Sequence, residues 1–258
     1  MHSLTGKRVL ITGAGGGIAQ AAIAALRAGG ATVVGVDLRP GDGILAGDVR
    51  EPDAMRAVVA TAVQQTGGLD ILVNCAGIGT VQDAGAMPDE ETRRTVEINF
   101  WGPWITTAAA LPHLLESHGH VVNVTSFLAV ATIPFASAYC ASKHALDAYS
   151  NCLRFEYMDR LSVSTVRPGY VKTQIHAGPA AQGLSLEGMV NEDSVEQAAS
   201  AIVRACTHRD RWVTTSRQTR AALFVAQHLP RVVENAIIRR GRRNNFALGA
   251  LGEVRPAG

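Results

Sequence analysis

The sequence predicts an α/β protein built on a doubly wound parallel sheet, and three observations carry this prediction. Apolar, β-branched segments of strand length alternate with helical segments along the chain. The strand segments are almost continuously apolar, which is typical of strands covered by helices on both faces. A glycine-rich turn joins the first strand segment to the first helical segment. These features favour one domain of about seven strands over residues 1–258.

The expected elements follow in a regular order. Strands are expected at residues 7–12, 31–37, 44–48, 69–74, 120–126, 161–169 and 211–215. Helices are expected at residues 16–29, after Pro52, and at 88–117, 137–160, 193–207 and 218–241, the last broken at Pro230.

Two of these elements leave alternatives open. Residues 88–117 form one long helix or a bent pair, because Pro103 and Pro112 interrupt the pattern. Only LRPGDG connects Asp37 to Ile44, which is too short for a crossover helix. Either the third strand joins the sheet through an unusually tight loop, or its assignment is wrong.

Composition places the chain among folded proteins. Of its 258 residues, 47% are hydrophobic and 18% are charged, which supports a sizeable core. No apolar run reaches the ~18–20 residues of a membrane helix, and the start, MHSLTGKRVLITG, lacks a signal-peptide pattern. The four cysteines show no metal-type spacing, so we expect reduced thiols, no metal site and a cytosolic protein.

Charge is concentrated toward the C-terminus, where residues 216–258 form an extension. From Arg204 onward there are eleven Arg against three acidic residues, although the whole chain is only +2. Such a tail suits a phosphate-rich partner or an anionic membrane. The chain holds 21 Arg and only 3 Lys, however, which indicates a coding bias. We therefore expect no nucleic-acid partner and keep membrane association as a less favoured alternative.

The stretch TGAGGGIAQ lies between the first strand and the first helix. Glycines there let the backbone approach an anion, and the free amides of a helix N-terminus face it, so the stretch predicts a phosphate site. Asp37 ends the second strand 20 residues after Gly17, where an acidic residue accepts hydrogen bonds from an adenosine ribose. A carboxylate also repels a 2′-phosphate, which favours NAD over NADP. Arg39 works against that preference, because a guanidinium pairs with phosphate.

Several motifs then occur in a fixed order. They are T-G-x-x-x-G-I, N-x-A-G, a later Asn, a Ser 13 residues before Y-x-x-x-K, and P-G after the sixth strand. Over residues 4–215 the chain resembles the short-chain dehydrogenase/reductase family. The resemblance implies a seven-stranded Rossmann sheet and a reversible hydride transfer between a nicotinamide and an alcohol or carbonyl. It also implies a homodimer or homotetramer, with helices 88–117 and 137–160 between subunits.

Carried over position by position, the resemblance implies a catalytic set of Asn99, Ser126, Tyr139 and Lys143, with Asn99 holding a proton-relay water. The implied cofactor-binding residues are Gly13, Gly17, Ile18, Asp37, Asp48, Val49, Asn74, Ala76, Gly77, Tyr139, Lys143, Pro168, Gly169 and Thr173. The chain departs from the family pattern at Ala19, where a glycine is usual, and at Cys75, where an asparagine is usual.

The spacing of Tyr139 and Lys143 also indicates a chemical role, independently of the resemblance. Positions i and i+4 share a helix face, so the ammonium lies near the phenol. Tyrosine has an unperturbed pKa of ~10, and a nearby positive charge favours phenolate. We therefore expect Lys143, together with a positive nicotinamide ring, to lower the pKa of Tyr139 and make it an acid–base group. Ser126 is placed to hold the substrate oxygen.

The segments expected at the substrate-binding side of the pocket, beyond the carboxyl ends of the strands, carry few charged residues. The expected substrate-binding residues are Ser126, Phe127, Tyr139, Tyr170 and His176, with an apolar wall that includes Leu128, Ile133, Ile175 and Met189. Residues 174–192 are expected to form a lid, and residues 218–241 to cover the pocket or pack on another subunit.

These features favour a lipophilic secondary alcohol or ketone, such as a steroid or long-chain compound, with NAD as cofactor. One alternative is an NADPH-dependent ketone or 3-oxoacyl reductase. Another is a binding protein that senses NAD without turnover.

Overall fold

The computed structural model of the protein describes residues 2–172 and 192–243. Four residues with an expected role lie outside this range: Thr173, Ile175, His176 and Met189. The expected lid, residues 174–192, also lies outside it, apart from Glu192.

Seven parallel strands form the central sheet in the order β3-β2-β1-β4-β5-β6-β9, which confirms the predicted fold class. The reversal of strand order beside β1 is the switch point at which such sheets bind ligands. The strands are β1 (Arg8–Thr12), β2 (Thr32–Asp37), β3 (Ile44–Ala46), β4 (Ile71–Asn74), β5 (His120–Val124), β6 (Ser162–Arg167) and β9 (Trp212–Thr214).

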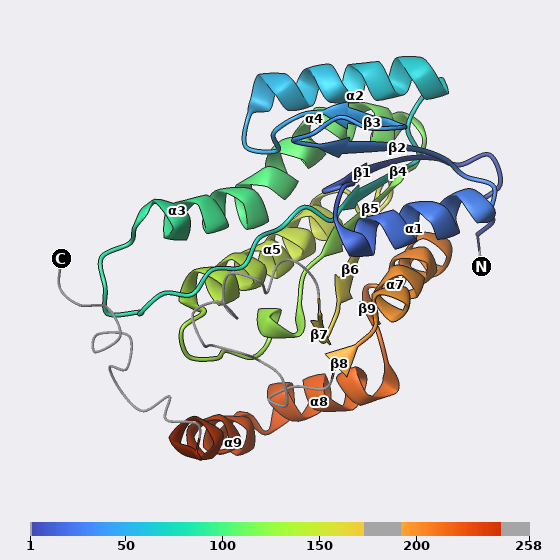
Figure 1. Ribbon diagram of the computed structural model, residues 1–258. Helices are drawn as coiled ribbons and strands as arrows, with labels where there is room; N and C mark the ends of the chain where they lie inside the picture. The colour runs from blue at the N-terminus through green and yellow to red at the C-terminus, as the bar shows by residue number, and fades with distance from the viewer. Residues whose placement is uncertain (1, 173–191, 244–258) are drawn as a thin grey trace.

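Helices cover both faces of the sheet, as its apolar strands require (Figure 1). Figure 1 shows α2 and α4 above the sheet and α1 and α7 below it. Each layer packs its own cluster of aliphatic side chains against the strands. The helices are α1 (Gly17–Ala28), α2 (Pro52–Thr66), α3 (Glu90–Val96), α4 (Gly102–Glu116), α5 (Ser137–Glu156), α7 (Val195–His208), α8 (Arg217–His228) and α9 (Pro230–Arg243).

The third strand does join the sheet through a tight loop. β3 pairs parallel with β2, with Ile44 opposite Gly35. The Gly35 N–H donates to the Gly43 carbonyl at 2.8 Å, so the pairing starts within the loop itself. Gly43 has φ +66°, a left-handed conformation that glycine adopts without strain. Six connecting residues suffice because β3 is only a three-residue edge strand.

The helical segment expected at residues 88–117 is continuous from residue 90 to residue 116. Of the two alternatives, one long helix or a bent pair, the structure has the first, with a bent, irregular turn inside it. A five-residue π-helical turn, Glu97–Trp101, joins α3 to α4. Pro103 lies in the first turn of α4 and has no N–H to donate to the carbonyl four residues earlier, that of Asn99. The bend therefore lies at the residue for which a catalytic role is expected, and Pro112 continues within α4.

Three short elements were not predicted from the sequence. They are the parallel pair β7 (Tyr170–Val171) and β8 (Glu192–Asp193), and a 3-10 turn at Phe127–Ala129. Strands of two residues carry no periodicity for a pattern to detect. The break between α8 and α9 falls at Pro230, as expected. Among the described helices, none combines the length and apolar character that crossing a bilayer requires.

His120, at the start of β5, is a fully buried polar residue in the sheet. The Ser164 hydroxyl donates to the Asp210 carbonyl at 2.6 Å. The contact of 2.9 Å between His120 Nε2 and Ser164 Oγ is therefore a bond donated by Nε2–H. Burial, with neighbouring Arg209 a smaller cause, lowers the pKa of His120 to about 3.

This pKa makes the fold sensitive to acid. Below the ordinary histidine pKa of 6.5 the unfolded chain binds a proton that the native protein does not bind until about pH 3. Stability is therefore lost as pH falls, by about 2–3 kcal/mol at this residue between pH 7 and 4.5. We predict that His120→Gln loses about that much less stability over this interval than the wild type does. Urea unfolding at both pH values measures this difference, and parallel losses would contradict it.

Candidate active site

A cavity of about 920 Å³ lies at the carboxyl ends of the strands. This is where doubly wound sheets bind ligands. The predicted site residues that line it are Gly13, Gly17, Ile18, Asp37, Asp48, Val49, Ala76, Gly77, Ser126, Phe127, Tyr139, Lys143, Pro168, Gly169 and Tyr170. The structure thus brings together positions that are up to 157 residues apart in the sequence, from Gly13 to Tyr170.

The glycine loop is shaped for a close backbone approach. Gly13 has φ +68°, and a Cβ there would lie 2.7 Å from the Ala76 Cα atom, so no larger residue fits. Gly17 begins α1, and a Cβ there would meet no protein atom within 4 Å. The open space at Gly17 adjoins the unpaired amides of the helix N-terminus. This arrangement fits the pyrophosphate of a dinucleotide.

A residue of this loop missed by the sequence reasoning, Thr12, fixes the loop after β4. Its hydroxyl oxygen accepts from the N–H groups of Cys75 and Ala76, both at 3.0 Å. The only sequence signal was its place in the T-G-x-x-x-G-I motif. Asp37 is fixed too, because its carboxylate accepts from the N–H groups of Gly15 at 2.9 Å and Leu38 at 2.8 Å.

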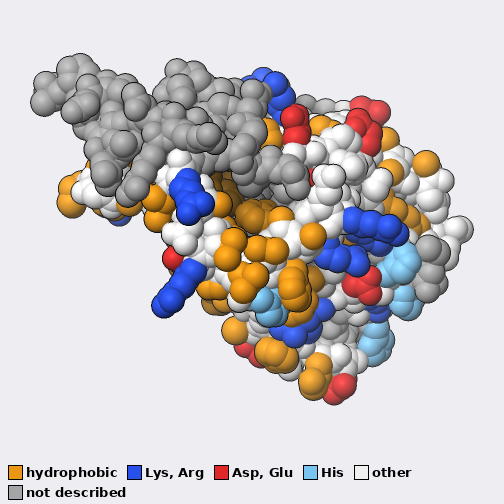
Figure 2. Space-filling view, turned by 90° about the horizontal axis from the view of Figure 1, so that it is seen from below, with side chains coloured by type: hydrophobic (Ala, Val, Ile, Leu, Met, Phe, Trp, Pro, Cys, Tyr) orange, Lys and Arg blue, Asp and Glu red, His pale blue; other side chains and the backbone are white. Residues whose placement is uncertain are grey.

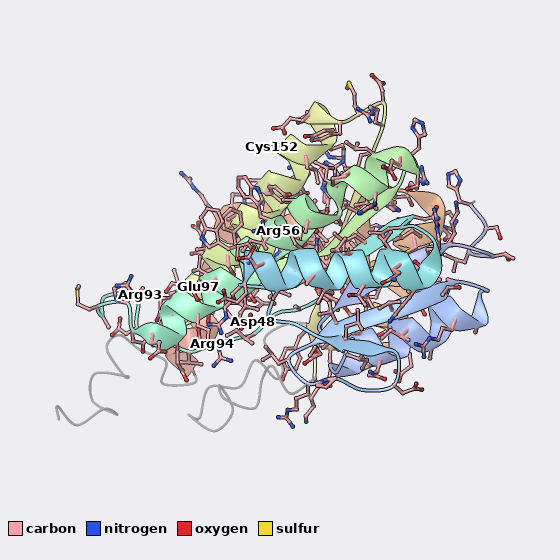
Figure 3. All side chains as sticks on the ribbon, turned by 90° about the horizontal axis from the view of Figure 1, so that it is seen from above. Asp48, Arg56, Arg93, Arg94, Glu97 and Cys152 are labelled. Atoms are coloured by element: carbon pink, nitrogen blue, oxygen red, sulfur yellow. The ribbon has the colours of Figure 1, made fainter. Side chains whose placement is uncertain are left out.

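Asp48 has a strong partner that the sequence reasoning did not anticipate. Its carboxylate forms an ion pair with Arg50, at 2.7 Å from the Nη2 atom, and that bond holds the pKa of Asp48 below its usual range. Arg50 also lies 3.7 Å from Glu97. Figure 3 shows Asp48, Arg94 and Glu97 gathered near the junction of α3 and α4. Both Arg50 and Arg94 line the cavity, so its adenine end carries two cations beside the expected carboxylate.

Tyr139 and Ser126 both line this cavity, and the Ser126 hydroxyl lowers the pKa of the Tyr139 phenol in part. Ser126 also begins the 3-10 turn, where its oxygen accepts from the Leu128 N–H at 3.1 Å, so its rotamer is fixed by the turn. Lys143 lies one helical turn from Tyr139 with its Nζ atom 5.7 Å from the ring centroid, and it donates to the Val124 carbonyl at 3.1 Å. The expected group of hydroxyls and ammonium is therefore assembled in one place.

The expected direction of the tyrosine pKa is wrong for the protein without cofactor. Burial raises the pKa of Tyr139 to about 12, and the Ser126 hydroxyl opposes this only in part. Burial also lowers the pKa of Lys143 to about 8. Desolvation penalises phenolate and ammonium alike, and it is the largest cause of both shifts. Tyr139 is thus a neutral phenol at neutral pH, whereas Lys143 keeps its charge.

Asn99 lies behind this group rather than on the cavity wall. Its side chain forms two bonds with the backbone of Ile78, accepting from the N–H at 2.9 Å and donating to the carbonyl at 2.9 Å. A Cβ on Gly77 would lie 3.2 Å from Asn99 Oδ1 and 3.5 Å from Lys143 Nζ. Glycine at this position lets the asparagine and the lysine approach the same space.

Asn74, predicted to bind cofactor, does not line the cavity. Its side-chain amide donates to Asn123 at 2.8 Å and Thr107 at 3.1 Å, so it joins β4 to β5 and α4. The described bonds of Asn74 thus join elements of the fold, and its cofactor contact stays a prediction. Of the two departures, Ala19 is buried in the core, and burial raises the pKa of the Cys75 thiol to about 11, which keeps it protonated.

Gln82 is a further residue that the sequence did not reveal. The donors around it set its amide orientation, with the oxygen accepting from the N–H groups of Ser137, at 3.3 Å, and Ala138. These are free amides in the first turn of α5, whose own N-cap residue, Ala136, supplies no side-chain bond. Gln82 thus caps the helix that carries Tyr139. Because it lies 55 residues from Ser137, no local pattern could indicate this.

The fold and the cavity define a Rossmann-type protein whose site is shaped for a dinucleotide beside a tyrosine–serine–lysine group. The family model described as short chain dehydrogenase matches residues 7–182. The chain belongs to this family.

Named relatives and solved structures agree with that membership. Dehydrogenase/reductase SDR family member 7B of Mus musculus is 35% identical over 60% of this chain and 49% of the mouse protein, so the chain spans about half that relative's length. The 11-beta-hydroxysteroid dehydrogenase 1A of Arabidopsis thaliana is 32% identical over 83% of this chain and 69% of the plant protein.

Two solved structures share the fold. Thermoplasma acidophilum aldohexose dehydrogenase aligns with a TM-score of 0.74 at 24% identity, over 83% of this chain and 95% of that one. A short chain dehydrogenase from Burkholderia cenocepacia, crystallised with NADP, aligns with a TM-score of 0.78 at 21% identity, over 92% and 99% of the two chains.

Alanine substitutions at the two loop glycines are predicted to affect different properties, cofactor binding at Gly17 and stability at Gly13. Gly17→Ala adds a methyl group to open space, so we expect a melting temperature within about 2 °C of the wild type and NADH binding weakened about tenfold or more. Gly13→Ala forces a clash and a strained φ, so it is expected to lower stability by roughly 1–3 kcal/mol. Calorimetric melting and NADH fluorescence titration measure both effects. Unchanged NADH affinity in Gly17→Ala would refute the assignment of this space.

Proposed function

We propose that the protein is an NAD-dependent oxidoreductase that interconverts a secondary alcohol and a ketone. The observation that carries the proposal is that Tyr139, Ser126 and Lys143 line the same cavity as the glycine loop. A bound nicotinamide would supply or accept the hydride. The protein's own residues then have to orient one oxygen and move one proton.

The neutral phenol of Tyr139 suits the acid role. In ketone reduction it would donate its proton to the substrate oxygen as hydride reaches carbon, while the Ser126 hydroxyl holds that oxygen in place. In alcohol oxidation it would have to accept the proton as phenolate. The Lys143 ammonium supports that state, because it keeps its charge at neutral pH and lies on the same helix face. Lys143 is buried, whereas Tyr139 is partly exposed on the cavity wall, where it can meet a substrate.

NAD rather than NADP is favoured by the place of Asp37. Its carboxylate lines the cavity at the end of β2 and is fixed by two backbone N–H groups, so it faces any ribose bound there. The competing candidate is an NADPH-dependent ketone reductase. Arg39 in the next loop supports it, and so does the NADP found in the Burkholderia cenocepacia protein.

The substrate is proposed to be lipophilic. The cavity wall beyond Tyr139 includes Phe127 and Leu128, and α8 and α9 add Val225, Val233 and Ile237. Hydrophobic side chains also gather on the face seen from below, where α8 lies (Figure 2). The plant relative is named as a hydroxysteroid dehydrogenase, which supports a steroid-like or long-chain compound.

Self-association through α4 and α5 is also proposed. Trp101 and Trp104 on this surface are 48% and 42% exposed, and Trp104 stacks on Tyr149 of α5. Phe155 and Met158 extend the exposed apolar surface near the end of α5. Contiguous exposed aromatic side chains are typical of interfaces, so the helices expected between subunits present the right surface.

Replacement of Tyr139 tests the chemistry. Tyr139→Phe removes one hydroxyl, and we predict a fall in kcat of about 10²–10⁴-fold with NADH affinity within about threefold of the wild type, because the proton transfer is lost while the cavity keeps its shape. Nicotinamide absorbance over a panel of ketones and secondary alcohols measures turnover. Tyr149→Phe, outside the cavity, is the matched control. Tight NADH binding with no turnover of any compound by the wild type would instead favour an NAD-sensing protein.

Replacement of Asp37 tests the cofactor preference. Asp37→Ala removes the ribose acceptor and the charge that repels a 2′-phosphate, so NADH is expected to bind about 10-fold or more weakly, with no loss for NADPH. Asp42→Ala, an exposed change in the same loop, should leave both dissociation constants unchanged. A wild type that prefers NADPH would establish the competing candidate.

A further inference from the structure

Asp193, in β8, is a buried carboxylate that the proposed chemistry does not use; it is 3% exposed. Its Oδ2 atom accepts three hydrogen bonds, from the Gly169 N–H at 2.9 Å, from the Thr219 hydroxyl at 2.9 Å and from the Thr215 hydroxyl. Within residues 2–172 and 192–243, no basic side chain forms an ion pair with it. Three donors on one oxygen offset the cost of burying the charge.

The three donors belong to different parts of the site. Gly169 follows Pro168, and the Pro168 carbonyl accepts from the Phe127 N–H at 2.7 Å. The Pro168–Gly169 segment is thereby joined to the loop that carries Ser126. Thr215 follows β9, and Thr219 lies in the first turn of α8. One carboxylate oxygen therefore connects the catalytic loop, the wall segment after β6 and the helix below them.

The position of α8 decides the shape of the cavity. Thr219, Ala222 and Val225 line the cavity, and Leu223 is buried against the interior. After the break at Leu229 the chain enters α9, which adds more of the wall. Figure 1 shows β7 and β8 between the sheet and α8. The bonds from Gly169 and Thr219 place the Asp193 carboxylate between the segment after β6 and α8.

The backbone of Asp193 is already held without its side chain. Asp193 lies opposite Val171 in the parallel pair of β7 and β8. The side chain is thus not needed to keep β8 in place, and its three bonds reach elements outside this pair. A carboxylate suits that use, because one oxygen accepts several bonds and charge-assisted bonds are stronger than neutral ones.

We propose that Asp193 is a positioning residue that fixes the distance between the Pro168–Gly169 segment and α8. It thereby makes the cofactor side and the apolar side of the cavity one rigid unit. The inference rests on the proposed function for the roles of the two sides, but it concerns binding geometry and not the transfer of hydride.

Two variants separate the two connections. Asp193→Asn keeps the shape of the side chain and removes the charge that holds all three donors. Thr219→Val keeps the shape of its side chain and removes the bond between Asp193 and α8, together with the bond that the Thr219 hydroxyl accepts from Ser216 within the N-terminal cap of α8. Ser194→Ala is the matched control, because Ser194 caps α7 next to Asp193 and bonds none of these groups. The probes are NADH for the cofactor side and an anilinonaphthalene sulfonate dye for the apolar side, both titrated by fluorescence, with melting temperature recorded.

We expect Asp193→Asn to raise the dissociation constants of both probes by about 3- to 10-fold, since both sides lose their common anchor. Thr219→Val should raise only that of the dye by a similar factor. The double variant should bind the dye no more weakly than Asp193→Asn alone, because both changes break one connection. Ser194→Ala should lower the melting temperature by about 2–4 °C and leave both constants unchanged.

The proposal is overturned if Asp193→Asn binds both probes as the wild type does, whatever its melting temperature, because Asp193 would then only stabilise the fold. Additive effects of the two substitutions on dye binding would overturn it as well. If Asp193→Asn does not fold, Thr219→Val and Thr215→Val still decide the matter through the same titrations. A wild type that binds NADH but turns over no ketone would contradict the proposed function and leave these binding results valid.

Discussion

The close approach of two backbone segments at the ends of β1 and β4 is the constraint on which the site depends. Gly13 and Ala76 come so near that a single methyl group on Gly13 would overlap the Ala76 backbone. The Thr12 hydroxyl holds the same pair of segments by accepting two N–H groups. This contact fixes the start of α1 relative to the loop before Gly77. The loop in turn leaves room for Asn99 and Lys143, so backbone geometry comes first and side-chain chemistry follows from it.

Burial also shapes the site, because it changes the pKa values of its titratable groups. The same desolvation raises the pKa of Tyr139 to about 12 and lowers that of Lys143 to about 8. Three buried polar groups outside the reacting pair have dedicated partners: His120 bonds Ser164, Asn99 bonds Ile78, and Asp193 collects three donors. The bonds of Asn99 and Asp193 hold those side chains in fixed positions next to the site, whereas Nδ1 of His120 has no partner among the described residues.

Periodicity and motif spacing predicted most of the fold, and the motif residues Ser126, Tyr139 and Lys143 line one cavity. The strands from Arg8 to Thr214 were predicted because short apolar, β-branched runs that alternate with helical segments are typical of a parallel sheet buried on both faces. The pairing of Asp48 with Arg50, the cap that Gln82 provides and the bonds of Asp193 could not be predicted. They depend on side-chain orientation or join residues far apart in the sequence. The bond of Asn74 to Asn123 could not be predicted either, because a motif gives the position of an amide but not its partners.

The π turn at Glu97–Trp101 links the interior of the protein to its surface. One additional residue in a helix rotates all that follows by about 100° around the axis. Within the turn, Asn99 is buried, whereas Trp101, which ends the turn, and Trp104, in α4, are exposed. The phase of the aromatic surface is thus set by the same insertion that bends the backbone at the asparagine. Deletion of the inserted residue of the π turn would restore a regular helix, but it would also rotate Trp104 around the helix axis. The position of Asn99 and the outer face of α4 are therefore coupled.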